Sequence, residues 1–345
     1  MDKWTKINGD MCHDMLIKNT VQKLSFNEQC DYKSWRDSVR DKLVELLGLA
    51  EIEKNKCEPN LKIEDTVEKD GYTQIRFVFE SEVGAFVPCY LLIPNTNKDK
   101  YPVAITLQGH STGFHNSIAE PKDDEDHDYA LGRGAFAVQA VKQGYAALAI
   151  EQRAMGERTT SRHSFSPWMC TFATMVAFQL GRTTLGERVW DIQRAIDLLL
   201  RFPMLDTEKI VLTGNSGGGT ATYYASCLDE RIKISAPSCS FCPYENSILD
   251  LRHCPCNHIP NAHKWFEMQD LACLIAPRTL LIIAGKEDAI FPMEGVRKGY
   301  ETVEKIFEKS GESGKCKLIE TPKNHWWCED IVWGAINEEA KRLGW

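Results

Sequence analysis

The strongest indication of the fold of this chain is the stretch IVLTGNSGGGT, residues 210–220. A short apolar, β-branched run precedes the segment GNSGG, residues 214–218, which fits the pattern G-x-S-x-G. In this pattern a serine stands on a sharp turn between a strand and a helix, and the flanking glycines leave room for it. We therefore predict that Ser216 is a nucleophile at the carboxyl end of a strand, with the N–H of Gly217 as an oxyanion donor.

A G-x-S-x-G match alone also describes an ordinary glycine-rich turn, so the residues that follow must decide. A buried-strand pattern at 279–284 runs towards Asp288, with Glu287 as its local rival, and a later strand-like segment precedes the loop that carries His325. The carboxyl ends of parallel strands share one edge of a sheet. We therefore predict a catalytic triad of Ser216, Asp288 and His325.

A further strand end offers a second oxyanion donor. The apolar run at 102–107 opens into QGHSTG, residues 108–113. We predict that the backbone N–H of His110 acts with that of Gly217. The alternative is a glycine turn in which His110 has no such role.

The rest of the chain predicts an α/β fold with a mostly parallel central sheet flanked by helices. Helical periodicity at 31–49 ends at Gly48, and three strand-like segments over 61–94 read as an antiparallel meander. We expect a single domain over 1–345, with an N-terminal arm and helix at 1–60 and the core at 61–345. Residues 1–30 carry little periodicity, which predicts an irregular arm.

Two loops near the predicted site carry charge. EQRAMGER, residues 151–158, follows a buried strand, and its ion pairs are expected to order it, with Arg153 as a candidate substrate contact. The acidic run at 120–128 lacks the spacing of a calcium loop and is interpreted as a solvated surface loop.

The segment 239–258 combines thiols and imidazoles that a zinc ion would accept as ligands. Its cysteines and histidines are Cys239, Cys242, His253, Cys254, Cys256 and His258. The C-x-C spacing does not match a zinc ribbon or finger, so we predict no metal and a loop lined with reduced thiols. His253 is a candidate substrate contact, and the aromatic residues Trp168, Phe172, Phe178, Trp326 and Trp327 either stack sugar rings or belong to the core; of these, Trp326 is the candidate contact.

Composition limits the classes of function. The chain has 345 residues, a formal net charge of −8 and a sequence pI near 5.7, which argues against a nucleic-acid partner. No apolar run suits a signal peptide or a membrane span, so we expect a cytoplasmic protein with no membrane partner. Thirteen cysteines in such a chain are expected to be reduced thiols rather than disulfides.

These motifs resemble the α/β-hydrolase superfamily over roughly residues 60–345. More narrowly, the chain is similar to the bacterial acetyl xylan esterase-like branch, near the dienelactone hydrolase and cephalosporin-C deacetylase families. The resemblance is carried by the meander and by QGHSTG, EQRAMGER, RVWDIQRAIDLL, GNSGGGT, HCPCNHIP, APRTLLIIAGKEDAIFP and PKNHWW. One departure is the QG at 108–109, where many relatives have HG.

The resemblance implies a serine ester hydrolase, with an acetyl or other small acyl group on a carbohydrate or similar alcohol as substrate. A serine peptidase or lactonase of the same fold is the alternative within catalysis, and a non-catalytic binding protein is the alternative from another class. No cofactor is expected. The expected partner is a small-molecule or oligosaccharide ester, and formation of a homo-oligomer is left open.

Overall fold

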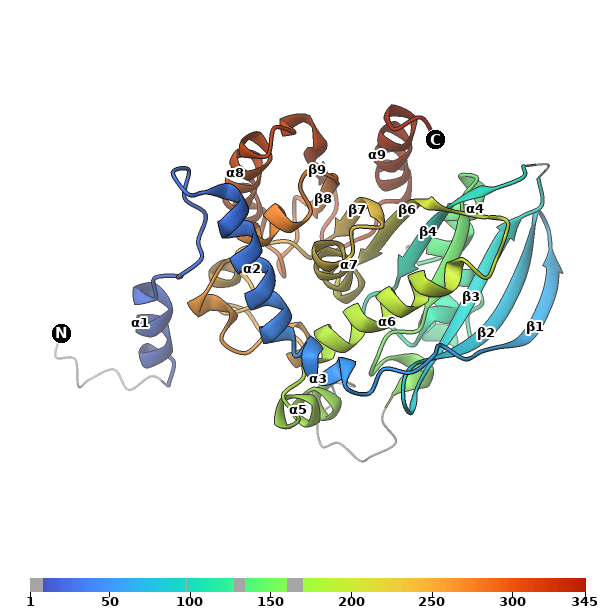
Figure 1. Ribbon diagram of the computed structural model, residues 1–345, viewed down its shortest axis with the longest axis horizontal. Helices are drawn as coiled ribbons and strands as arrows, with labels where there is room; N and C mark the ends of the chain where they lie inside the picture. The colour runs from blue at the N-terminus through green and yellow to red at the C-terminus, as the bar shows by residue number, and fades with distance from the viewer. Residues whose placement is uncertain (1–8, 97, 127–133, 160–169) are drawn as a thin grey trace.

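The computed structural model describes residues 9–96, 98–126, 134–159 and 170–345. Its centre is one nine-stranded sheet in the order β1-β2-β3-β5-β4-β6-β7-β8-β9 (Figure 1). The strands are β1 Leu61–Lys69, β2 Tyr72–Glu82, β3 Ala85–Pro94, β4 Tyr101–Leu107, β5 Ala146–Ile150, β6 Leu205–Asn215, β7 Ile232–Ser238, β8 Thr279–Gly285 and β9 Cys316–Thr321.

The sheet is antiparallel at one end and parallel elsewhere. Strands β1, β2 and β3 pair antiparallel, as does β3 with β5, whereas the pairs from β5 through β4 to β9 are parallel. Gly71 (φ +85°) and Gly84 (φ +81°) form the tight turns of the meander, in a backbone region that favours glycine. The predicted meander and mostly parallel sheet are confirmed.

The described helices fall on both sides of this sheet. They are α1 Met11–Asn19, α2 Tyr32–Leu47, α3 Leu49–Glu53, α4 Phe136–Lys142, α5 Thr171–Gln179, α6 Thr184–Leu199, α7 Gly217–Leu228, α8 Met293–Lys309 and α9 Glu329–Arg342. Helices α6, α7 and α8 cover one face with α2 outside them, and α4 and α9 cover the other (Figure 1).

Burial on both faces explains the continuous apolar runs of the central strands. In β4, Val103 and Ile105 belong to the core beneath α6 and α7, whereas Ala104 between them belongs to the core beneath α4 and α9. The same alternation holds in β8, where Leu280 and Leu281 lie on opposite sides.

The N-terminal region agrees with the sequence in one helix and differs in another. The Asp31 side chain accepts a hydrogen bond from the Ser34 N–H (2.9 Å) and caps α2, and the helix ends at Gly48 in the left-handed conformation, as predicted. The expectation of an irregular arm is wrong for α1. That helix has no buried residue, so no apolar stripe marks it in the sequence.

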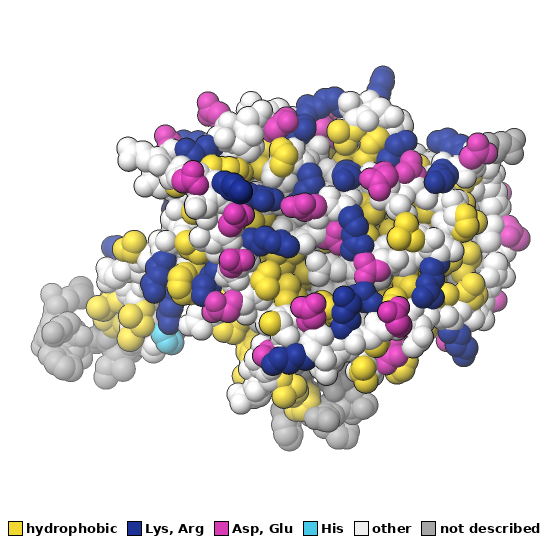
Figure 2. All heavy atoms as spheres, viewed as in Figure 1, with side chains coloured by type: hydrophobic (Ala, Val, Ile, Leu, Met, Phe, Trp, Pro, Cys, Tyr) yellow, Lys and Arg dark blue, Asp and Glu magenta, His cyan; other side chains and the backbone are white. Residues whose placement is uncertain are grey.

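On the face shown in Figure 2, Lys and Arg side chains are interspersed with Asp and Glu side chains. Ion pairs such as Arg36–Glu230 (3.2 Å) are exposed and contribute little to stability. Among the described residues, no helix combines the length and apolar character needed to cross a bilayer.

The parallel strands position the site. Strands β4, β6, β8 and β9 run in the same direction, so their carboxyl ends meet at one edge of the sheet. The loops at this edge carry His110, Ser216, Asp288 and His325 in turn.

Candidate active site

The nucleophile elbow lies between β6 and α7. Ser216 has φ 56° and ψ −123°, a strained conformation that places it at the start of α7. A Cβ on Gly214 would lie 2.5 Å from the Leu107 carbonyl oxygen, and one on Gly218 would lie 2.2 Å from it. Both positions therefore require glycine, for the steric reason that the sequence suggested.

Asp288 and His325 form the expected acid and base pair. His325 Nδ1 lies 2.8 Å from Asp288 Oδ2, and Asp288 Oδ1 accepts hydrogen bonds from the N–H groups of Ile290 (2.8 Å) and Phe291 (3.1 Å). Asp288 is buried, whereas its sequence rival Glu287 is exposed. This arrangement fixes Nδ1 against a carboxylate and leaves Nε2 for a second partner.

A small cavity of about 80 Å³ brings Ser216 and His325 onto the same wall. Its described lining is Gln108, Gly109, His110, Ser111, Asn116, Gly134, Phe136, Asn215, Ser216 and His325. Asp288 is not on that described lining and contacts His325 from behind. The geometry thus places a hydroxyl, an imidazole and a buried carboxylate in the order that a triad requires.

The loop after β4 closes on the elbow. A Cβ on Gly109 would lie 3.0 Å from the Ser216 Cβ and from the Asn215 carbonyl oxygen, so a larger residue here would press the loop away from the elbow by a few tenths of an ångström. Among the described residues, no group accepts a hydrogen bond from the His110 N–H. That N–H therefore keeps its hydrogen-bonding capacity beside the nucleophile, which suits an oxyanion donor.

Gln108, at the start of the loop after β4, is held by Glu151. Gln108 Nε2 donates to Glu151 Oε1 (2.7 Å), and the Gln108 carbonyl oxygen accepts from Gln152 Nε2 (2.5 Å). Glu151 also accepts from the N–H groups of Phe114 (3.3 Å) and Glu157 (3.2 Å). Burial raises the pKa of Glu151 to about 7. These contacts identify the hydrogen-bond partners of Gln108, which the sequence left undetermined.

A second network supports the far end of this loop. Asp126 is fully buried and contacts His115 Nε2 (2.8 Å), Asn116 Nδ2 (3.3 Å), the Thr112 hydroxyl and the Lys122 N–H (2.8 Å). Burial alone would raise the pKa of Asp126, but these hydrogen bonds hold it well below its usual range. The interpretation of the acidic run as a solvated loop is therefore wrong at Asp126.

Arg153 is a structural residue in this fold. Its guanidinium contacts Asp191 (3.0 Å) and Glu82 (2.6 Å), while Arg158 contacts Asp191 from the other side (2.7 Å). Burial alone would raise the pKa of Asp191, but the two arginines lower it to about 2. These ion pairs confirm the expected ordering role of the loop. Arg153 is absent from the described lining of the cavity, so its contact with substrate remains a prediction.

His253 and Trp326 also lie outside the described lining of the cavity. His253 Nε2 lies 2.9 Å from the Ser247 hydroxyl, and its ring meets Phe291, which in turn stacks on His325. Burial, followed by the neighbouring histidines, lowers the pKa of His253 to about 4. His253 therefore supports the base through one intervening ring, and its direct substrate contact stays without support.

The aromatic residues proposed for sugar stacking separate in the structure. Trp327 is buried and donates a hydrogen bond to Gln139 Oε1 (2.9 Å), which places it in the core beneath α4 and α9. Trp168 lies outside the described residues. Phe136 lines the cavity instead and packs edge-on against Trp327 (4.6 Å between ring centroids).

The segment 239–258 does not form one cluster. Cys239 lies beside Asp288 and His325, and the Cys242 Sγ lies 3.9 Å from the Pro292 carbonyl oxygen. Cys254 and Cys256 instead approach residues from two distant segments.

Sequence reasoning missed several residues of the site. Ser111 and Asn116 line the cavity, and Glu151 holds the loop that contains them. Their position just after the ends of β4 and β5 was the available signal. No local pattern distinguished them from ordinary loop residues.

Comparison with known proteins places the chain in a family. The model of the family described as "Abhydrolase family" matches residues 6–310. The chain belongs to this family. The match includes Ser216 and Asp288, whereas His325 lies beyond the matched residues.

Relatives of this Abhydrolase-family protein agree in fold. YtaP of Bacillus subtilis (strain 168), provisionally named a hydrolase, is 25% identical over 262 residues, which cover 74% of this chain and 82% of YtaP. A structure from Bacteroides fragilis NCTC 9343, provisionally named an acetyl xylan esterase, has a TM-score of 0.77 at 18% identity and covers 97% of this chain and 95% of its own. A glucuronoyl esterase from Solibacter usitatus has a TM-score of 0.65 at 16% identity, covering 93% and 97%. The predicted α/β-hydrolase fold, shared with acetyl xylan esterases, is thereby confirmed.

Proposed function

We propose that this protein is a serine carboxylic-ester hydrolase that removes acetyl or another small acyl group from a carbohydrate or similar alcohol. The observation that carries the proposal is the pairing of His325 with the buried Asp288 at 2.8 Å, on a cavity wall that also presents Ser216. A non-catalytic protein would have no need to maintain this pair beside a strained serine.

In the proposed mechanism, Ser216 Oγ attacks the ester carbonyl carbon while His325 Nε2 takes its proton. Asp288 holds the imidazole tautomer and stabilises the imidazolium. The N–H groups of Gly217 and His110 donate to the oxyanion of the tetrahedral intermediate. The leaving alcohol receives the proton from His325, and an acyl-enzyme remains on Ser216.

The second half-reaction repeats these roles with water. His325 takes a proton from water, the hydroxide attacks the acyl carbon, and the intermediate collapses with return of the proton to Ser216 Oγ. A carboxylic acid leaves and the enzyme is regenerated. The same groups act in both half-reactions: the side chains of Ser216, His325 and Asp288 and the N–H groups of Gly217 and His110.

Two observations favour a small acyl group on a carbohydrate. The cavity of about 80 Å³ is small beside the several hundred cubic ångströms of a typical ligand pocket, which suits an acetyl group better than a long acyl chain. Solved structures of the same fold include an acetyl xylan esterase from Paenibacillus sp. R4 and glucuronoyl esterases, which are named for esters of carbohydrates.

The test compares initial hydrolysis rates for p-nitrophenyl acetate, butyrate and octanoate, an acetylated xylo-oligosaccharide and a methyl glucuronate ester. The matched control is Ser216→Ala, which removes the nucleophile and leaves the elbow glycines in place. We expect serine-dependent release from the acetyl substrates, with a loss of roughly 10⁴-fold or more in Ser216→Ala.

Other outcomes would redirect or overturn the proposal. Preference for the glucuronate ester would mean that the sugar acid itself supplies the acyl group of the substrate. Hydrolysis of peptide or lactone substrates with no ester turnover would assign the alternatives of the same fold. Equal rates in wild type and Ser216→Ala would exclude Ser216 as the nucleophile, and no turnover of any substrate would favour a binding protein.

A further inference from the structure

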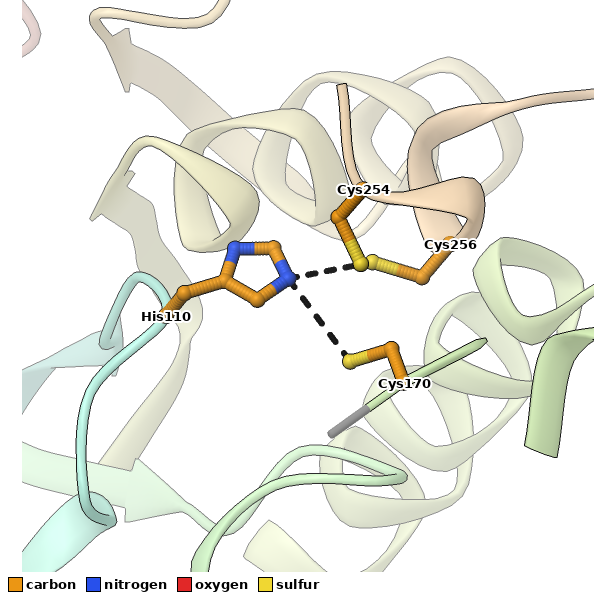
Figure 3. A group of neighbouring side chains, drawn as sticks. All are labelled: His110, Cys170, Cys254 and Cys256. Carbon is orange, nitrogen blue, oxygen red and sulfur yellow. Dashed lines mark hydrogen bonds between the residues drawn. The ribbon is translucent and has the colours of Figure 1, made fainter. Parts of the chain in front are cut away.

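Four side chains with metal-binding atoms point towards one another (Figure 3). They are His110, Cys170, Cys254 and Cys256, whose ligand atoms all lie within 4.8 Å of one another. They come from three separate segments: the loop after β4, the residue that precedes α5, and the start of the short 3-10 helix η6, Pro255–Asn257, which Cys254 precedes and which contains Cys256. The three cysteines are buried free thiols.

The spacing of these atoms matches a tetrahedral zinc site. His110 Nε2 lies 3.2 Å from the Cys256 Sγ and 3.6 Å from the Cys170 Sγ. Bonds of about 2.3 Å to sulfur and 2.0 to 2.1 Å to nitrogen place the corners of a tetrahedron about 3.6 to 3.8 Å apart. Two contacts are therefore already near the required separation, and no ligand atom pair exceeds it by much more than about 1 Å.

The charge around the cluster suits the same ligand. Three thiolates, a neutral imidazole and a divalent cation carry one net negative charge. The fully buried Arg188 places guanidinium nitrogens 3.3 Å from the Cys256 Sγ and 3.4 Å from the Cys170 Sγ, where it would neutralise that charge. The remaining hydrogen bonds of Arg188 go to the Arg153 carbonyl oxygen (2.9 and 3.2 Å), which fixes the guanidinium in place.

We propose that His110, Cys170, Cys254 and Cys256 bind a structural zinc ion. Thiolate-rich tetrahedral sites select zinc over the hard cations, and four protein ligands leave no open position for water or substrate. The prediction of no metal was based on segment 239–258 alone, and only two of the four proposed ligands lie in that segment.

Because of its position, the metal would affect catalysis indirectly, by holding the loop that carries His110. The His110 ring lies about 3.0 Å from the place that a Cβ on Gly217 would occupy, so the ion would sit one ring away from both oxyanion donors. By tying the loop after β4 to η6 and to the start of α5, zinc fixes the His110 backbone against the elbow. His110 is therefore a positioning residue through its side chain and an oxyanion donor through its N–H.

The first experiment measures zinc in the purified full-length chain by mass spectrometry of the dissolved metal. We expect about one zinc per chain in wild type and less than about 0.1 in Cys170→Ser and Cys254→Ser. The matched control is Cys227→Ser. Cys227 is a buried free thiol in α7 whose Sγ lies 3.5 Å from the Leu271 carbonyl oxygen, a contact that serine can keep, and we expect full zinc content.

A second measurement protects the test against variants that fail to fold. Wild-type protein is stripped with a chelator and loaded with Co²⁺, and its visible spectrum is recorded. Bands of tetrahedral thiolate coordination support the site. Wild-type protein with less than about 0.1 zinc per chain and no such bands would overturn it, as would one bound iron in place of zinc.

The positioning role has its own readout. The stripped enzyme is expected to lose kcat for its ester substrate and to regain it with Zn²⁺ but not with Mg²⁺, because Mg²⁺ prefers oxygen ligands. Unchanged kcat in fully stripped enzyme would overturn this role. Zinc content and the cobalt spectrum require no substrate, so they stand or fail independently of the proposed esterase activity.

Discussion

The proposed triad and the cysteine–histidine cluster both lie at the elbow between β6 and α7, but they are built in different ways. Each triad residue follows a strand of the parallel sheet, and local glycines or turn residues hold it there. The cluster instead joins three loops that share no periodicity, with His110 as its only residue near a strand end of the sheet. Sites set by strand ends can be read from a sequence, whereas sites set by the packing of loops depend on the whole fold.

The largest effect on activity is expected from Asp288→Asn, which changes the proposed triad and leaves the cysteine–histidine cluster intact. The change reverses hydrogen bonding to His325 Nδ1 and favours the wrong tautomer, so kcat should fall by roughly 10³- to 10⁴-fold. Steady-state kinetics on the best ester provides the measurement. The neighbouring Glu287→Gln is the control and should stay within about twofold of wild type, because Glu287 is exposed.

Zinc content measured on the same Asp288→Asn protein sharpens the contrast. We expect it to equal that of wild type, since Asp288 contacts none of the four proposed ligands among the described residues. Loss of zinc in this variant would show that the two regions are not separate.

A substitution at an elbow glycine is expected to lower the free energy of unfolding. In Gly218→Ala the new Cβ would meet the Leu107 carbonyl oxygen at 2.2 Å, and neither backbone can move without disturbing the sheet. We expect a loss of about 3 kcal/mol or more in the free energy of unfolding, measured with urea.

Gly334→Ala in α9 is the matched control for that change. No atom lies within 4 Å of its Cβ position, and the residue is an exposed helical glycine. Alanine should raise the free energy of unfolding by up to about 1 kcal/mol. Equal effects of the two substitutions would contradict the steric account of the elbow.

Glu151 supports the loop between the two regions, and its burial predicts a pH dependence. Its pKa is raised from 4.5 to about 7 in the folded protein, so the folded state binds the proton more tightly than the unfolded chain. The corresponding stability is present below the unfolded pKa and is lost as pH rises through about 7. Glu151→Gln should remove this fall, which amounts to roughly 2 to 3 kcal/mol.

Urea unfolding of wild type and Glu151→Gln at about pH 5 and about pH 8 measures the difference. The exposed Glu53→Gln serves as control and should follow the wild-type curve. A Glu151→Gln curve parallel to that of wild type would show that this carboxyl does not titrate in the window.

The smallest effect is expected where the two regions touch. In Gly217→Ala the new Cβ would lie 3.0 Å from the His110 ring and 3.4 Å from the Met155 methyl group, so the ring must give by a few tenths of an ångström. We expect kcat to fall about tenfold through displacement of the oxyanion loop, with unchanged zinc content. Unchanged kcat would mean that the His110 ring does not control the position of its own backbone.

The sheet and the elbow could be predicted from the sequence, as could the placement of Ser216, Asp288 and His325 after successive strands. Buried parallel strands require continuous apolar runs, a serine on a strained turn requires glycines around it, and Ser216, Asp288 and His325 each follow such a run. The meander and α2 were equally readable from alternation, periodicity and the glycine at position 48.

The contacts between loop residues could not be predicted from the sequence and depend on the folded structure. Arg153 pairs with Glu82 and Asp191, which are distant from it in the sequence. Cys254 and Cys256 lie close to His110 and Cys170, not to the other cysteines of segment 239–258. The physical reason is that loop side chains are placed by the packing of the elements that carry them, and no local spacing encodes that packing.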